Sequence, residues 1–122
     1  MNQPKDLIRH ISGGRVLDVA TGSGGFVHFL VEGLQTYAEV IGIDANEHAA
    51  APFTEAFKDT PQVRFEPMDA RQMNFPEASF DTVCIANSLH HFEHPEAVLS
   101  EMRRVLRAGG RLILAEMYCD GQ

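Results

Sequence analysis

A glycine-rich turn and an acidic side chain are spaced as in sites that bind a nucleoside. The turn Gly-Ser-Gly-Gly occupies residues 22–25, and Asp44 lies 22 residues after Gly22. Glycines allow the backbone to approach a ligand where a Cβ atom would collide. An acid at the end of the second strand of a βαβ unit accepts hydrogen bonds from two ribose hydroxyls. The spacing therefore indicates ribose binding by Asp44, with the N-cap of a following helix as its alternative role.

Two further acids stand in or near apolar runs. Asp18 interrupts the run that leads into the glycine turn, and a carboxylate inside a buried strand needs partners. We expect backbone N–H groups of the turn or the ammonium group of a ligand to supply them. Asp69 and Ala70 follow the third apolar run. Asp69 can accept a hydrogen bond from a purine amino group and Ala70 offers a backbone N–H, with a surface turn as the alternative.

Apolar runs alternate with helical patterns along the chain. We expect strands over residues 15–20, 39–43, 62–66, 80–86 and 111–118, and helices over residues 5–11, 26–34 and 95–108. Another short helix should begin near Pro52, after an irregular turn at residues 46–51, with Phe53, Ala56 and Phe57 facing the sheet. Gly109-Gly110 should end the last helix. Repeated β-α units build a parallel sheet with right-handed crossovers, so the fold class is α/β, doubly wound.

Size and composition indicate one globular domain over residues 1–122. The chain has 44% hydrophobic and 22% charged residues, and its formal net charge of −7 disfavours nucleic acid as the main partner. Cys84 and Cys119 lack the spacing of a metal site, and Cys84 is expected in the core. There is no signal peptide and no apolar run long enough for a membrane span, so we expect a cytoplasmic protein.

Four segments occur in the order and spacing of a known family. They are residues 16–24 (Val-Leu-Asp-Val-Ala-Thr-Gly-Ser-Gly), 41–44 (Ile-Gly-Ile-Asp), 74–81 together with 87–92 (Asn-Phe-Pro-Glu-Ala-Ser-Phe-Asp and Asn-Ser-Leu-His-His-Phe), and 106–112 (Leu-Arg-Ala-Gly-Gly-Arg-Leu). Together they resemble class I S-adenosylmethionine-dependent methyltransferases, in the small-molecule branch that includes the ubiquinone/menaquinone C-methyltransferases. The resemblance covers nearly the whole chain and implies a Rossmann-like, mostly parallel sheet of strand order 3-2-1-4-5.

The resemblance also implies a cofactor and a set of residues that bind it. S-adenosylmethionine would donate a methyl group to a small-molecule acceptor and become S-adenosylhomocysteine. The turn at residues 20–24 would contact the methionine moiety with support from Asp18, Asp44 would hold the ribose, and Asn87 would lie near the methionine end. The implied cofactor-binding residues are Asp18, Ala20, Thr21, Gly22, Gly24, Asp44, Ala45, Asp69, Ala70, Asn87 and Ser88.

His90 and His91 are candidate general bases for an acceptor that must lose a proton. An unperturbed imidazole titrates near neutral pH, which suits proton transfer. The alternative is that these side chains shape the pocket wall. A metal site at His90, His91 and His94 is disfavoured, because adjacent histidines rarely direct both rings at one ion and no carboxylate or cysteine pattern completes the set. No metal is therefore predicted.

The chain departs from the family pattern after its fifth strand. The family fold continues there with a helix and two further strands, whereas this sequence ends at Gln122. A truncated fragment is one interpretation, and a minimal cofactor-binding or interaction module without turnover is the alternative. The bare fifth strand, apolar on both faces, is then expected to pair with a second copy in a homodimer. A nicotinamide-dinucleotide domain is less favoured, since Val27 breaks the G-x-G-x-x-G spacing.

Overall fold

The fold is a five-stranded parallel sheet flanked by helices, and it was obtained as a computed structural model that describes residues 8–86 and 88–115. The sheet has the order β3-β2-β1-β4-β5, which confirms the expected order and the α/β class. The strands are β1 Arg15–Val19, β2 Glu39–Asp44, β3 Val63–Pro67, β4 Phe80–Ala86 and β5 Leu106–Ala115. The helices are α1 Gly25–Gly33, α2 Ala50–Ala56 and α3 Pro95–Val105, with 3-10 turns η2 Glu47–Ala49 and η3 Leu89–His91.

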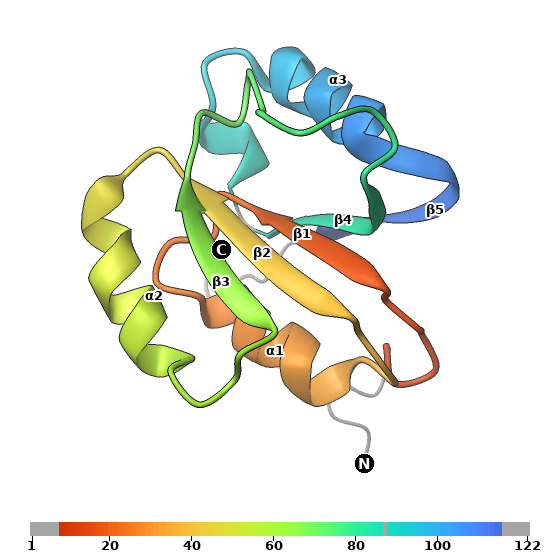
Figure 1. Cartoon of the computed structure of the whole chain (residues 1–122). Coiled ribbons are helices and arrows are strands. Elements are labelled where there is room, and N and C mark those ends of the chain that lie inside the picture. Colours follow the sequence, from red (N-terminus) through yellow and green to blue (C-terminus); the bar gives the residue numbers. More distant parts are fainter. Residues whose placement is uncertain (1–7, 87, 116–122) are drawn as a thin grey trace, which may run out of the picture.

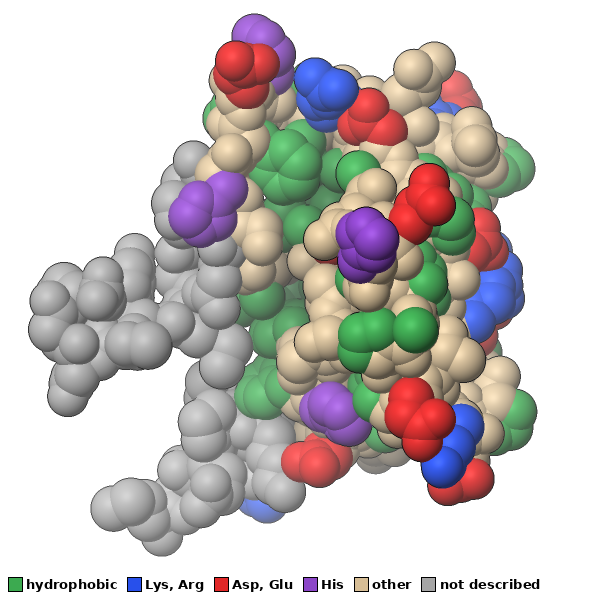
Figure 2. Space-filling model, turned by 90° about the vertical axis from the view of Figure 1, so that its left-hand side faces the viewer, with side chains coloured by type: hydrophobic (Ala, Val, Ile, Leu, Met, Phe, Trp, Pro, Cys, Tyr) green, Lys and Arg blue, Asp and Glu red, His purple; other side chains and the backbone are tan. Residues whose placement is uncertain are grey.

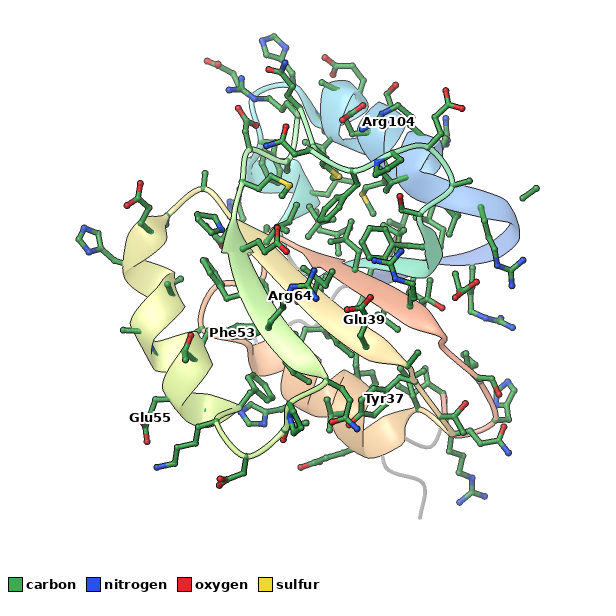
Figure 3. All side chains as sticks on the ribbon, viewed as in Figure 1. Tyr37, Glu39, Phe53, Glu55, Arg64 and Arg104 are labelled. Atoms are coloured by element: carbon green, nitrogen blue, oxygen red, sulfur yellow. The ribbon has the colours of Figure 1, made fainter. Side chains whose placement is uncertain are left out.

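Helices cover both faces of the sheet, as Figure 1 shows. α1 and α2 lie on one face, where Val27, Leu30 and Phe53 belong to one hydrophobic cluster. α3 lies on the other face, where Val98 and Met102 belong to a second cluster. In Figure 3, Phe53 points from α2 toward the sheet. Because all five strands are parallel, their carboxyl ends meet at one edge, which is where open α/β sheets bind ligands.

The central strands are buried on both faces, as their sequences predict. Val16, Leu17 and Val19 of β1 are fully buried, and Val83 and Cys84 of β4 are equally inaccessible. Continuous apolar runs of this kind are typical of parallel strands covered by helices on both sides. Burying one such aliphatic side chain contributes roughly 1.5–3 kcal/mol, so the position of β1 in the sheet is strongly fixed. The turn that follows β1 therefore begins from a rigid point.

The boundary between α3 and β5 differs from the prediction. We expected the helix to reach Ala108, but α3 ends at Val105 and Leu106 is already extended. Leu106 pairs with Phe80 at the start of β4, and this pairing overrides the helical propensity of the residues that follow. The register then shifts, and regular pairing with β4 resumes at Arg111. Gly109, with φ of 80°, lies in this irregular stretch.

Two other expectations about the helices are partly wrong. Residues 8–10 form a turn rather than a helix, closed by a 2.9 Å hydrogen bond from the Ile11 N–H to the Ile8 carbonyl; residues 5–7 lie outside the described part. Residues 47–49 form the 3-10 turn η2, capped by the Asn46 side chain, and α2 begins directly after it. Phe53 and Phe57 face the sheet as expected, but Ala56 is exposed because α2 ends there.

β5 forms the margin of the sheet next to β4 (Figure 1). Its residues pair in register with β4 from Arg111 to Ala115, and the predicted continuation over residues 116–118 lies outside the described part. Leu114 keeps 53% of its surface exposed, an unusual degree for a large hydrophobic side chain in a strand. Within the described ranges, no helix has the length and apolarity needed to cross a bilayer.

Candidate functional site

The turn after β1 adopts left-handed backbone conformations at three positions. Ala20 and Gly22 each have φ of 57°, and Gly24 has φ of 97°. At Gly24 a Cβ atom would also lie only 2.6 Å from the Phe57 ring, so no other residue fits without movement. At Gly22 no atom of the described residues lies within 4 Å of the position a Cβ would take, so its left-handed backbone faces open space. The Thr21 N–H donates to the Ile43 carbonyl at 2.9 Å and ties the turn to β2.

Asp18 is buried beneath this turn with one oxygen unpaired. Only 1% of its surface is exposed, and the Thr21 hydroxyl donates to Oδ2 at 2.8 Å. Within the described part of the chain, Oδ1 has no hydrogen-bond partner. Burial raises the pKa of Asp18 to about 7, the Thr21 hydrogen bond opposes this rise and the nearby Asp44 carboxylate adds to it. An unpaired buried carboxyl oxygen costs free energy, which a cationic or hydrogen-bond-donating ligand would recover.

A cavity of about 410 Å³ opens above Asp18. It is lined by Asp18, Ala20, Thr21, Ser23, Gly25, Phe26, Phe29 and Ala86. Phe26 and Phe29 lie stacked on α1, with ring centroids 5.1 Å apart. The cavity thus combines an acidic floor with an aromatic wall.

On the side of the molecule that carries α2, Figure 2 shows a strip of hydrophobic side chains at the surface, with acidic, basic and histidine side chains around it.

Asp44, at the end of β2, holds the turn from the neighbouring strand. Its Oδ2 accepts from the Gly22 N–H at 2.9 Å, and its Oδ1 accepts from the Asn46 N–H at 2.9 Å. Each carboxylate oxygen has two lone pairs, so both retain capacity for one further donor. The alternative role as a helix cap belongs to Asn46, whose side chain accepts from the His48 N–H at 3.0 Å. Asp44 therefore remains available for a ligand.

A second cavity of about 230 Å³ adjoins the first. It is lined by Ala20, Ile43, Asp44, Ala45, Met68, Asp69, Ala70, Arg71, Phe92 and Glu93. Ala20 lines both cavities, so they meet at the turn. Three acids line the second cavity: Glu93, and the two that the sequence analysis assigned to the ribose and the base, Asp44 and Asp69. Together the two cavities form one elongated site along the carboxyl edge of β1, β2 and β3.

Asp69 has a charged partner that the sequence analysis missed. Its Oδ1 accepts from the backbone N–H of Arg71 at 2.8 Å and from Nε at 3.2 Å, and its Oδ2 accepts from Nη2 at 3.1 Å. These hydrogen bonds to Arg71 hold the pKa of Asp69 below its ordinary value. The predicted surface turn is also present, since the Gln72 N–H donates to the Asp69 carbonyl.

The segment after β4 is only partly described. Ser88 donates from its hydroxyl to the Ala86 carbonyl at 3.0 Å, and Ala86 lines the first cavity. Asn87 and the side chain of His90 lie outside the described residues. His91, on η3, is exposed and lines neither cavity. Among the described residues, no group of three or more His, Cys, Asp or Glu side chains is arranged to hold a metal ion.

Comparison with known sequences places the chain in a family. Residues 17–114 match a family described as a methyltransferase domain. The chain belongs to this methyltransferase family. It is 38% identical over 112 residues to demethylmenaquinone methyltransferase of Thermus thermophilus, covering 91% of this chain and 50% of that protein. It is 33% identical over 108 residues to the ubiquinone/menaquinone biosynthesis C-methyltransferase UbiE of Burkholderia mallei, covering 85% and 43%.

Solved structures, two of them described as methyltransferases, have the same fold. The YcgJ protein of Bacillus subtilis matches with a TM-score of 0.79 and 26% identity, over 94% of this chain and 49% of that one. A putative methyltransferase of Bacillus halodurans matches with a TM-score of 0.75 and 31% identity, over 86% and 45%. An S-adenosylmethionine-dependent methyltransferase of Mesorhizobium loti matches with a TM-score of 0.72 and 25% identity, over 85% and 46%.

These matches confirm the expected family and fold, and S-adenosylmethionine as the cofactor of this methyltransferase domain. The chain spans about half the length of the curated relatives it matches. Its acidic strand ends and glycine turn lie within the matched residues 17–114. The residues that sequence reasoning did not single out are those lining the cavities through tertiary contact, namely Ser23, Phe26, Phe29, Met68, Arg71, Ala86, Phe92 and Glu93.

Proposed function

We propose that the domain binds S-adenosylmethionine along the edge formed by β1, β2 and β3 and takes part in methyl transfer to a small-molecule acceptor. The observation that carries this proposal is the unpaired Oδ1 of Asp18, buried at the floor of the first cavity beside the glycine turn. A carboxylate in this position is suited to an ammonium group, and the methionine moiety of the cofactor has one. The names of the Thermus and Burkholderia relatives support a small molecule as the methyl acceptor.

Each part of the cofactor has candidate partners among the predicted residues. The turn at residues 20–24 and Asp18 would hold the methionine moiety, with Asn87 and Ser88 at the same end. Asp44 and Ala45 would hold the ribose, and Asp69 and Ala70 the adenine. The continuity of the two cavities through Ala20 supports this order, since one elongated ligand can occupy both.

The bound cofactor supplies an electrophilic methyl group on a sulfonium, so the chain mainly has to orient donor and acceptor. The aromatic wall of Phe26 and Phe29 would exclude water from the first cavity. For an acceptor that must lose a proton, His90 and His91 are the candidate bases. Turnover by single alanine variants of each would test them, and only a large loss with unchanged cofactor affinity would support the role in base catalysis.

Calorimetric titration with S-adenosylhomocysteine and, in parallel, NAD tests the proposed cofactor. We expect micromolar-range binding of S-adenosylhomocysteine and no measurable binding of NAD. Tight NAD binding without an S-adenosylhomocysteine signal would overturn the proposal. A methyl-transfer assay with demethylated quinols then separates an active enzyme from a domain that binds the cofactor without turnover.

Three further properties are part of the proposal. The first is that residues 1–122 form one domain, so chemical unfolding should be a single cooperative transition. The second is that the protein is cytoplasmic. β5 is the outermost described strand, and we propose that it pairs with a second copy, because Leu114 is exposed and only Arg111 is charged among residues 111–115. Sedimentation over the micromolar range should show a dimer that Ile113→Pro dissociates. A monomer at every concentration would contradict the pairing.

A further inference from the structure

The Asp69 carboxylate in the second cavity can accept only one more hydrogen bond. A carboxylate has about four acceptor sites, two on each oxygen. Arg71 fills two sites on Oδ1 through its backbone N–H and Nε, and one on Oδ2 through Nη2. With these donors from the described residues, one acceptor site remains, on Oδ2. A base that binds beside Asp69 meets an acceptor whose position and capacity are both set by Arg71.

Arg71 itself is held at the rim of this cavity. Its guanidinium contacts Asp69 in a two-point arrangement, which fixes orientation better than a single contact does. The Glu93 carboxylate attracts it from the segment after η3, and Glu93 lines the same cavity. The Asp69–Arg71 pair is about half exposed, with 47% and 50% of the two side chains accessible, so it adds little to folding stability. A contribution to ligand recognition is the better account of this geometry.

We propose that Arg71 is a positioning residue that restricts Asp69 to a single acceptor directed at an amino group, so that the second cavity selects adenine over a 6-oxo purine. This inference rests on the proposed function and deepens it. Adenine presents an amino group at its C6 position, which can donate to Oδ2. Hypoxanthine presents a carbonyl oxygen there, which an ionised carboxylate repels. Because Arg71 occupies three acceptor sites of Asp69 and contacts both of its oxygens, the carboxylate cannot rotate to accommodate the carbonyl.

The test compares the affinities of S-adenosylhomocysteine and S-inosylhomocysteine by calorimetry. In the unmodified domain we expect the adenine ligand to bind at least about tenfold more tightly. Arg71→Ala should lower this ratio by about threefold or more, with the unfolding midpoint unchanged. Arg71→Lys keeps the charge but not the two-point contact, so it should restore the ratio only in part.

Arg64→Ala is the matched control. Arg64 lies on β3, is 52% exposed and is paired with Glu39 and Glu66, but it does not line either cavity. Figure 3 shows Arg64 and Glu39 lying side by side on the sheet. Its loss should leave the ratio of affinities unchanged. An equal effect of Arg64→Ala and Arg71→Ala would mean that net charge alone is responsible, which would overturn the positioning role.

Asp69→Asn separates failure of this inference from failure of the proposed function. The asparagine amide can donate to a carbonyl oxygen, so this variant should shift the preference toward S-inosylhomocysteine. If it does so while Arg71→Ala leaves the ratio unchanged, Arg71 is not a positioning residue and the cofactor assignment stands. If the unmodified domain binds neither ligand, the proposed function and this inference both fail. Tighter adenine binding by Arg71→Ala would show that Arg71 competes with the base and would also overturn the inference.

Discussion

The ionisation of Asp18 should control both the stability of the domain and its affinity for the cofactor. Asp18→Asn is the informative change, since it keeps the shape of the side chain and the acceptor for the Thr21 hydroxyl but removes the titration. The folded carboxyl group has a pKa of about 7, against an ordinary value of 3.8. The folded state thus binds this proton more tightly than the unfolded state does. The stability that the neutral group contributes is complete below pH 3.8 and is lost as the pH rises to about 7.

The magnitude follows from the size of the shift. A difference of about 3 pKa units corresponds to about 4 kcal/mol between acidic and alkaline limits, at roughly 1.4 kcal/mol for each unit. The stability changes with pH mainly below the folded pKa of about 7. Between pH 5 and pH 8 it therefore changes over about two pH units, which corresponds to about 3 kcal/mol. Asp18→Asn remains neutral at both values. Its free energy of unfolding relative to the unmodified domain should therefore increase by about 3 kcal/mol from pH 5 to pH 8.

Urea unfolding of both proteins at several pH values measures this difference, and other titrating groups cancel because they are common to both. Cofactor binding should show the opposite trend, since an ammonium group favours the ionised carboxylate. Affinity for S-adenosylhomocysteine should rise from pH 5 to pH 7 in the unmodified domain, whereas Asp18→Asn should bind weakly without this dependence. Parallel curves of stability against pH for the two proteins would refute the assignment of this pKa to Asp18.

Four further substitutions have specific expected outcomes. Asp44→Ala should weaken S-adenosylhomocysteine binding at least about tenfold in calorimetry, because the two ribose hydroxyls proposed to donate to Asp44 would lose their acceptor. Unchanged affinity would contradict the ribose contact and leave Asp44 only its hydrogen bonds to the backbone. Gly22→Val should abolish binding, since its side chain would enter the space proposed for the ligand, and its positive φ should cost about 1–2 kcal/mol in urea unfolding. Gly24→Ala should lower the free energy of unfolding by at least about 2 kcal/mol, through backbone strain and overlap with Phe57. Gly25→Ala is its control: no atom of the described residues lies within 4 Å of the new Cβ, so stability should change by less than about 0.5 kcal/mol.

The fold was predictable where burial on both sides of a strand leaves a continuous apolar run. β4 was predicted with its observed bounds, Phe80–Ala86, because a strand covered on both faces favours apolar residues at nearly every position. The end of α3 was not predictable in this way. Residues 106–108 continue a helical pattern, and only the pairing of Leu106 with Phe80, 26 residues earlier in the chain, shows where the helix must end. Long-range pairing is not visible in local periodicity.

The site was predictable to the extent that backbone position defines it. Asp18, Asp44 and Asp69 were predicted from their places in or after parallel strands, whose carboxyl ends share one edge, and they line the two adjoining cavities. Arg71 was missed because its role depends on a two-residue turn that directs its guanidinium back onto Asp69. The aromatic wall was missed for a different reason. Phe26 matches the apolar stripe of α1, and the sequence does not indicate that its ring lines a cavity.

The state of Asp18 also distinguishes between the two cofactor classes that the glycine turn allows. In a dinucleotide site the group beside such a turn is a pyrophosphate, which carries negative charge. Here the buried Asp18 carboxyl group lies beside the turn, and an anion next to it would raise its pKa further and oppose its ionisation. An ammonium group has the opposite effect, since it pairs with the ionised form and satisfies Oδ1. The same buried carboxyl group that lowers the stability of the domain at neutral pH therefore favours a ligand with a cationic end and disfavours NAD.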